Sequence, residues 1–518
     1  MEVRGAPYRV ITETEWYCIG QPHQQVTIET LPDDVLLKIF KSTVDAMYAD
    51  YYQSQQWRVL VHVCRRWRNL LFTFARHLNL RLLLKPSKRS VKAMLDIWPE
   101  LPIYIYALDC STKEVRDNTA AALRLIHRVS GIRFDSSSSL DWGTFVSLMQ
   151  HPLPVLTHLW VQPSISGNYS IPRSFLGGSA PSLQDLLLAD VPFPALPELL
   201  LSTTNLVRLL YDNIPRAGYI CPQAMVTSLS ALTRLESLCL TFLSPQSVPD
   251  RSIQILPPHT RTLLPALTYF RYRGDTKYME DLVAQLDAPI LESMVITLFH
   301  ERVLEVSELA KFVRRADKLS LVDRAKVTFG PDCISLTLSQ ELLVGRVDPK
   351  TLMLNPTCSE PELRLSYLAR FCASCLPTFS PFRCLYILAP HHDTWKDVKD
   401  DPDPQWLELL RLFNLVKDLR LSYYIAPHIA EVLRKLPAER ITEVLPALEN
   451  LFISGIEPSG PMREAIFGFS DARELSGHPV SIYDWEGRER VTRWSTSARW
   501  NISEFVGLVV RRFPSSLP

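Results

Sequence analysis

A short apolar phrase of the form Leu-x-x-Leu-x-Leu recurs along the middle of the chain. Its last two apolar positions alternate, which is the period of a β-strand that buries one face. The first six clear copies start 27, 23, 29, 32 and 24 residues apart. The eight clear copies are Leu156/Leu159/Val161, Leu183/Leu186/Leu188, Leu206/Leu209/Tyr211, Leu235/Leu238/Leu240, Leu267/Phe270/Tyr272, Leu291/Met294/Ile296, Val416/Leu419/Leu421 and Leu448/Leu451/Ile453, and three weaker ones are Val129/Ile132/Phe134, Val322/Ala325/Val327 and Phe382/Leu385/Ile387.

The stretches between the phrases, such as 225–232 and 277–286, are predicted to form helices or irregular returns. No unit can bury its apolar face alone, so neighbouring units must stack into one continuous core. The spacing overlaps the period of about 20–29 residues of leucine-rich repeats, although their Asn positions are missing. We therefore predict an irregular, leucine-rich-repeat-like solenoid over residues 81–460. The alternative is an ordinary α/β sheet with coincidental leucine-rich strands, which eleven copies with similar lead-ins disfavour.

Within each phrase, the residue between the last two apolar positions points to the opposite, concave face of the predicted solenoid. Most of these residues are apolar or aromatic, whereas a solvated face would be mostly polar. Either this face binds a target protein or another part of the chain covers it. The candidate target-binding residues are Trp160, Leu187, Leu210, Arg271, Val295, Tyr386, Arg420 and Phe452, with Cys239 at the same position of its phrase.

Two amphipathic stretches near the N-terminus, 31–40 and 57–71, follow the helical period instead. Pro32 suits the first turn of a helix, and the two acidic residues after it face the positive end of the helix dipole. The apolar positions then recur every three or four residues on one helix face. A helical pair this short cannot bury both stripes alone, so it is predicted to complete its core on a partner.

The order of residues in these stretches, Leu31-Pro32-x-Asp34-Val35-Leu36-x-x-Ile39-Phe40 and then Val63-Cys64-Arg65-Arg66-Trp67-Arg68, resembles an F-box. The resemblance is to basidiomycete-type F-box domain proteins and continues into the repeats. Residues 49–56 make the gap between the two strings longer than in a compact F-box. The adaptor-binding residues that the resemblance implies are Leu31, Pro32, Leu36, Ile39, Phe40, Val63, Cys64 and Trp67.

The resemblance implies a substrate-recognition subunit of a Skp–cullin–F-box ubiquitin ligase. Its helices would bind a Skp-family adaptor and, through it, a cullin, while the repeats would hold a target protein. Such a chain acts by proximity, is no enzyme and needs no cofactor. The alternative is a non-catalytic scaffolding solenoid without ligase association, whose F-box-like hairpin caps the first repeat.

The predicted fold class is therefore α/β, with a helical F-box followed by the irregular solenoid and a C-terminal cap. Residues 1–27 form an N-terminal tail, 28–80 the F-box helical domain, 81–460 the solenoid and 461–518 the cap. The last segment contains three tryptophans but no leucine phrase. Terminal repeats need such an atypical cover to keep water from the core.

Composition narrows the classes of partner. The chain has 518 residues and a formal net charge of +1, so nothing draws it as a whole to nucleic acid or to an anionic membrane. Residues 58–89 carry nine Lys or Arg and no acid, which favours an acidic protein partner because the basic motif of a nucleic-acid site is missing. Ten scattered cysteines and the absence of an apolar leader indicate a cytoplasmic or nuclear protein.

Candidate catalytic chemistry is sparse. Only 17 glycines are present, and no phosphate-binding glycine pattern, metalloprotease motif or serine elbow occurs. Cys372 and Cys375, with Cys384, His391 and His392 downstream, offer ligand types that zinc uses. No second pair matches the first, and a helix would place both of its cysteines on one buried face. We therefore predict no metal site.

Overall fold

The protein is described by a computed structural model. The described residues are 28–48, 57–75, 77–78, 80–84, 95, 100–107, 112–135, 142–163, 170–249, 260–299, 306–319, 322–330, 334–340, 351–356, 361–375, 382–389, 403–437, 440–454 and 460–484. The chain divides into two compact units, with a boundary between Arg81 and Leu82. The described residues of the first, the helical unit, end at Arg81, and those of the second, the repeat unit, begin at Leu82.

The helical unit consists of a short 3-10 helix, η1 (Ile28–Thr30), and three α-helices, α1 (Asp33–Tyr48), α2 (Trp57–Val61) and α3 (Arg65–Thr73). The period of three and four residues across 57–71 therefore spans two helices instead of one. The break lies at Cys64, whose backbone is extended and whose sulfur accepts a hydrogen bond from the Trp67 N–H at 3.5 Å. Cys64 thus begins α3 as its N-cap.

The repeat unit alternates strands and helices. Its strands are β1 (Leu82–Leu84), β2 (Ile103–Ala107), β3 (Val129–Asp135), β4 (His158–Gln162), β5 (Asp185–Ala189), β6 (Arg208–Ile214), β7 (Ser237–Phe242), β8 (Thr262–Leu263), β9 (Tyr269–Gly274), β10 (Leu286–Asp287), β11 (Ser293–Leu298), β12 (Arg324–Phe329), β13 (Ile334–Ser339), β14 (Thr351–Pro356), β15 (Cys384–Leu388), β16 (Asp418–Leu421), β17 (Asn450–Ile453) and β18 (Ser481–Asp484). Its helices are α5 (Lys113–Leu123), α6 (Trp142–Leu148), η2 (Phe175–Gly178), α7 (Leu196–Leu200), η3 (Arg216–Gly218), α8 (Pro222–Leu229), η4 (Pro245–Ser247), α9 (Thr276–Val283), α10 (Ser307–Arg314), α11 (Pro361–Cys375), α12 (Asp403–Arg411), α13 (Ala426–Arg434) and α14 (Pro461–Leu475).

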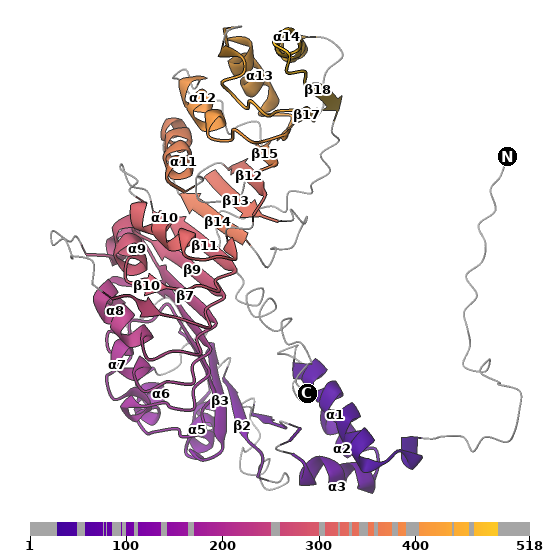
Figure 1. Cartoon of the computed structure of the whole chain (residues 1–518). Helices are drawn as coiled ribbons and strands as arrows, with labels where there is room; N and C mark the ends of the chain where they lie inside the picture. The colour runs from indigo at the N-terminus through magenta and orange to yellow at the C-terminus, as the bar shows by residue number, and fades with distance from the viewer. Residues whose placement is uncertain are drawn as a thin grey trace, which may run out of the picture. The chain divides into compact units, whose positions relative to one another are not determined.

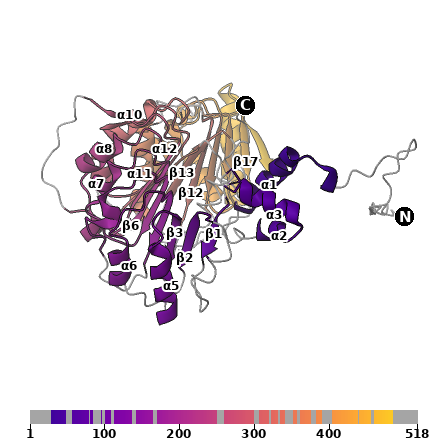
Figure 2. The same cartoon turned by 90° about the horizontal axis from the view of Figure 1, so that it is seen from below.

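Sixteen of these strands form one sheet, and the α-helices of the repeat unit follow one face of it (Figures 1 and 2). Each of the eleven predicted phrases contains a strand, from β3 to β17. The apolar residues of the phrases pack under the helices in a single core, for example Leu186, Leu238 and Leu419 at 1% exposure or less. This mixed α/β arrangement is consistent with a leucine-rich-repeat-like solenoid.

The sheet departs from a regular repeat in one place. Most neighbours are parallel, but β13 is antiparallel to both β12 and β14, and β14 pairs with β11. The spatial order is therefore β11-β14-β13-β12-β15, so three strands form a reversed meander inside the sheet. This insertion explains why the phrase at 322–327 is weak and irregularly spaced: its strand is not the next in space after β11.

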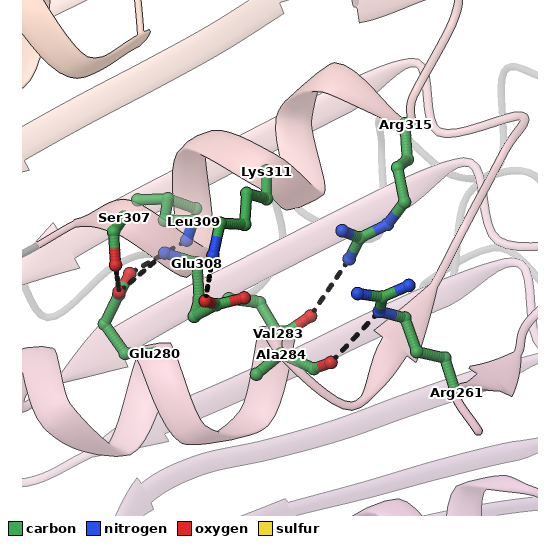
Figure 3. Close-up of polar contacts among 9 residues, drawn as sticks. All are labelled: Arg261, Glu280, Val283, Ala284, Ser307, Glu308, Leu309, Lys311 and Arg315. Atoms are coloured by element: carbon green, nitrogen blue, oxygen red, sulfur yellow. Dashed lines mark hydrogen bonds and ion pairs between the residues drawn. The ribbon is translucent and has the colours of Figure 1, made fainter. Parts of the chain in front are cut away.

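Side chains also join adjacent repeats on the helical side (Figure 3). Glu280 of α9 accepts hydrogen bonds at 2.8 Å from the backbone N–H groups of Glu308 and Leu309, and so caps the start of α10. At the C-terminal end of α9, Arg315 donates to the Val283 carbonyl at 3.3 Å and Arg261 to the Ala284 carbonyl at 3.2 Å. Neighbouring units therefore provide hydrogen-bond partners for N–H groups at the start of α10 and for carbonyls at the end of α9.

The described part of 461–518 adds one further helix and the last strand of the sheet. After the helix α14, β18 pairs parallel with β17 as a further strand of the sheet. Arg473 of α14 is fully buried and donates to the carbonyls of Pro446 and Leu448 at 3.2 Å. Residues 461–484 thus pair with the sheet at its end without a leucine phrase, and their role as a cap stays a prediction. Residues 485–518 lie outside the described residues.

Candidate interaction surfaces

In the helical unit, the structure brings together the two strings on which the F-box resemblance rests. Arg66 of α3 donates to the Leu31 carbonyl at 2.6 Å and forms an ion pair with Asp33 at 2.5 Å. The chain just before α1 therefore lies beside the start of α3, although more than thirty residues separate them in sequence. Leu31, Pro32, Val63 and Cys64 flank this contact, and we call these four residues the junction surface.

Two of the predicted adaptor contacts are buried in the helical unit. Leu36 is 0% and Phe40 is 1% exposed, and the Phe40 ring packs edge-on against Trp67 with centroids 4.8 Å apart. The prediction that Leu36 and Phe40 form an accessible docking stripe is therefore wrong: α1 buries its stripe on α2 and α3. Trp57 is also buried in this unit, and its ring N–H donates to the Arg81 carbonyl at 3.1 Å.

The other predicted contacts remain accessible. Val63 is 55% and Ile39 is 40% exposed, Pro32 and Cys64 are exposed, and Leu31 and Trp67 are half-buried. The exposed Arg65 and Arg68 add positive charge beside the junction surface. This part of the helical unit thus offers exposed apolar side chains, with basic residues of α3 and the exposed Asp33 and Asp34 close to them in sequence. Residues 49–56, the long gap between the strings, lie outside the described residues.

In the repeat unit, the predicted target-binding residues occupy one in-register row. Because side chains alternate along each strand, the row lies on the outer face, the face of the sheet opposite the helices. We call it the outer row: Tyr106, Arg133, Trp160, Leu187, Leu210, Cys239, Arg271, Val295, Met353, Thr337, Lys326, Tyr386, Arg420, Phe452 and Tyr483.

Arginines stack on aromatic rings near both ends of the outer row. The Arg133 guanidinium lies 3.7 Å from the Trp160 ring centroid and 5.2 Å from that of Tyr106. Near the other end, the Arg420 guanidinium lies 4.5 Å from the Phe452 ring centroid and 5.2 Å from that of Tyr386. Such contacts fix the orientation of the planar guanidinium.

Because of these stacks, the side chains of the outer row are less exposed than predicted. Trp160, Leu210 and Tyr386 are buried, at 5–6% exposure, so they are not the exposed apolar contacts expected. For the two aromatic residues the reason is the guanidinium over each ring. Leu187, Arg271, Val295, Arg420 and Phe452 are half-buried. Cys239 is fully buried, and this burial raises the pKa of its thiol to about 12, so the thiol is not a nucleophile at neutral pH.

The acidic groups on strands β5, β6 and β16 of the outer face already have partners. Asp185 forms ion pairs with Arg208 and with His158, the latter at 3.0 Å. Asp212 accepts from the Thr241 hydroxyl, and Asp418 accepts from the Asn450 amide at 2.8 Å. Asp185 thus faces a cation, whereas the hydroxyl and the amide that bond Asp212 and Asp418 leave the charge of those two carboxylates in place.

The two possible zinc ligands whose side chains the structure describes, Cys372 and Cys384, lie on different sides of the sheet. Cys372 is buried in α11 against the core, whereas Cys384 lies on the outer face with its thiol 3.4 Å from Asp418. His391 and His392 lie outside the described residues, as does the side chain of Cys375. Among the described residues, no three His, Cys, Asp or Glu side chains come together as metal ligands. No helix in the described part of the chain is long and apolar enough to cross a membrane.

Comparison with known proteins adds little. No family model and no curated protein matches the chain. One solved structure with detectable similarity is the leucine-rich repeat-containing protein LegL7 from Legionella pneumophila, at 14% identity, covering 72% of this chain and 96% of that one. The TM-score is 0.25, so this likeness carries no argument. The repeat architecture rests on the strand pairing described above.

Several residues of these surfaces were not identified from the sequence. Arg133 and Lys326 belong to weak copies of the phrase, and Tyr106 and Tyr483 lie on strands without a phrase. The basic residue between alternating apolar positions was the available signal at Arg133. Arg66 could not be found in this way, because its contacts depend on how α1 and α3 pack.

Proposed function

We propose that this chain is the substrate-recognition subunit of a Skp–cullin–F-box ubiquitin ligase. The helical unit would bind a Skp-family adaptor, and through it a cullin, while the outer face of the sheet would bind the target protein. The observation that supports this most is the packing of the two F-box-like strings into one helical unit, joined by Arg66 and with Val63 and Ile39 exposed.

The separate core of the helical unit also supports the proposal. The helical unit has its own core, with Leu36, Val44 and Trp57 at 0% exposure. The large core of the repeat unit contains none of these residues. A unit that folds on its own core and shows an apolar, basic surface suits docking to an acidic adaptor.

The experiment is co-purification of the full chain with a Skp-family adaptor and a cullin. The test variants are Leu31→Ala with Pro32→Ala, and Val63→Glu, all on the junction surface. The matched control is Val59→Glu, because Val59 is 66% exposed on α2. We expect the test variants to lose the adaptor and the control to keep it, with unchanged circular dichroism. Adaptor binding that survives both test variants would contradict the proposal.

A second candidate is a scaffolding protein without ligase association. Burial of Leu36 and Phe40 within the helical unit favours it, since both were expected adaptor contacts. Under this alternative the chain purifies without adaptor and cullin, while a target still co-purifies through the outer face.

A further inference from the structure

The last helix of the described repeat unit, α14, keeps one side exposed. It packs against α13 at the end of the row of helices (Figure 1), and its buried side chains include Ile466 and Phe469. The helical period places five exposed residues together on the other side. We call them the α14 face: Glu464, Phe467, Asp471, Glu474 and Leu475.

The α14 face is more apolar than the outside of a terminal helix should be. Leu475 is 90% exposed, the largest exposed fraction of any large apolar side chain in the described part of the chain, and Phe467 is 38% exposed. The outer side of the last unit in a solenoid is normally polar, because no neighbour covers it. A further cover over this helix is therefore expected.

The carboxylates of the same face are uncompensated. Within the described ranges, none of the three has an ion pair or a side-chain hydrogen bond. Asp471 and Glu474 lie in the last two turns of α14, where negative charge opposes the helix dipole. Of the two arginines of this helix, Arg463 stacks on the Phe467 ring, 4.3 Å from its centroid, and Arg473 is buried. A cationic cover would therefore stabilise the second half of the face.

The sequence directly after β18 has the complementary composition. Residues 485–500 contain four arginines, two glutamates and three tryptophans. They begin at the residue after Asp484, which ends β18, the last strand of the sheet. A helix of 15 residues such as α14 is about 22 Å long, whereas sixteen extended residues cover about 53 Å. The segment is therefore long enough to return along the whole helix.

We propose that residues 485–500 bind the α14 face of the same molecule, with arginines on its carboxylates and tryptophan rings on Phe467 and Leu475. This contact covers the C-terminal end of the repeat unit and does not depend on the proposed function. The short tether gives the segment an effective concentration on the order of 1 mM. It therefore has the advantage over a second copy or a separate basic protein at lower concentration.

The test measures hydrogen exchange of the full chain by mass spectrometry. A synthetic peptide of residues 485–500 gives the exchange rate of the segment without the helix. The first variant is Asp471→Lys with Glu474→Lys, which reverses the charge of the α14 face. The second is Arg490→Glu with Arg493→Glu, which reverses the charge of the segment. A third variant combines all four substitutions.

The matched control is Glu408→Lys, because Glu408 is an exposed carboxylate on another helix, α12. The first variant should keep α14 folded, since lysine near the C-terminal end of a helix suits the helix dipole. Exchange within α14 and β17 checks this directly and should be unchanged in every variant.

In the unmodified chain and in the control, we expect residues 485–500 to exchange at least about tenfold more slowly than the peptide. The first and second variants should each lose this protection, because like charges then face each other. The combined variant should regain it, because opposite charges meet again.

Three results overturn the inference: exchange of the segment at the rate of the peptide, protection that survives the first variant, or a combined variant no better protected than the first. Protection that rises with protein concentration between about 1 and about 100 µM also overturns it, because a second copy then binds the face. All the substitutions lie outside the helical unit, so adaptor co-purification remains a separate test of the proposed function.

Discussion

The helical unit and the outer face of the sheet were both expected to display apolar side chains, and the two regions differ from this expectation in different ways. In the helical unit, Leu36 and Phe40 of the α1 apolar stripe are buried in the core of the unit. On the sheet, the predicted residues stay in their row, but arginines cover two of the rings. The difference shows that a strand's face follows from its period, whereas a short helix's exposed face depends on its neighbours.

The largest effect should come from breaking the core of the helical unit. Phe40→Ala removes the ring that packs on Trp67 and should destabilise this unit by about 3–5 kcal/mol. Because the unit has its own core, hydrogen exchange should accelerate in residues 28–81 and stay unchanged in the repeat unit. Phe74→Ala is the control, since Phe74 is 39% exposed. Equal acceleration in both units would show that they share one core.

A second test addresses the repeat unit at its last strands. Arg473→Ala removes hydrogen bonds to the Pro446 and Leu448 carbonyls and leaves them buried, which should cost about 2–4 kcal/mol. Hydrogen exchange should accelerate around α14, β17 and β18 and not in the helical unit. Arg463→Ala on the same helix should have little effect. If both variants behave alike, Arg473 does not hold α14 to the sheet.

The junction between α9 and α10 gives a third, smaller effect. Glu280→Ala removes the acceptor for the Glu308 and Leu309 N–H groups and should lower stability by about 1 kcal/mol, as the loss of a helix cap does. Thermal unfolding of the variant beside Lys311→Ala measures it. A melting temperature equal to that of the unmodified chain would contradict the capping role.

The same residue makes stability depend on pH. Burial raises the pKa of Glu280 above its ordinary value of 4.5, against the lowering by the two N–H bonds. The folded state therefore binds a proton more tightly than the unfolded state. The stability from this group is complete below pH 4.5 and is lost as pH rises through the raised pKa. Relative to Glu280→Gln, the melting temperature of the unmodified chain should fall as the pH rises from 4.5 through the raised pKa. A constant difference would exclude this titration.

The smallest effect belongs to the ion pair at the junction surface. Asp33 and Arg66 are both substantially exposed, so Asp33→Ala should cost no more than about 1 kcal/mol. Asp34→Ala, one residue along, should cost less because Asp34 is exposed and Arg66 contacts Asp33. Unfolding by urea measures both, and a larger loss for Asp34→Ala would contradict the geometry.

The repeats could be predicted in detail because their signal is local. The alternation of apolar positions in each phrase predicts where the strand lies, which side chains it buries and which one it places on the outer face. Leu159, Trp160 and Val161 are an example. The reversed meander β12–β13–β14 could not be predicted, because the hydrophobic period of a strand does not indicate which strand it pairs with. For the same reason the stack of Arg133 on Trp160 was missed: it requires two strands in register.

The proposed function depends on binding of an adaptor to the junction surface of the helical unit. Hydrogen exchange of the full chain with and without a Skp-family adaptor measures this binding directly. We expect slower exchange in residues 31–40 and 62–68, with no change on the strands of the sheet. Unchanged exchange in those residues at saturating adaptor, or protection confined to the sheet, would contradict it.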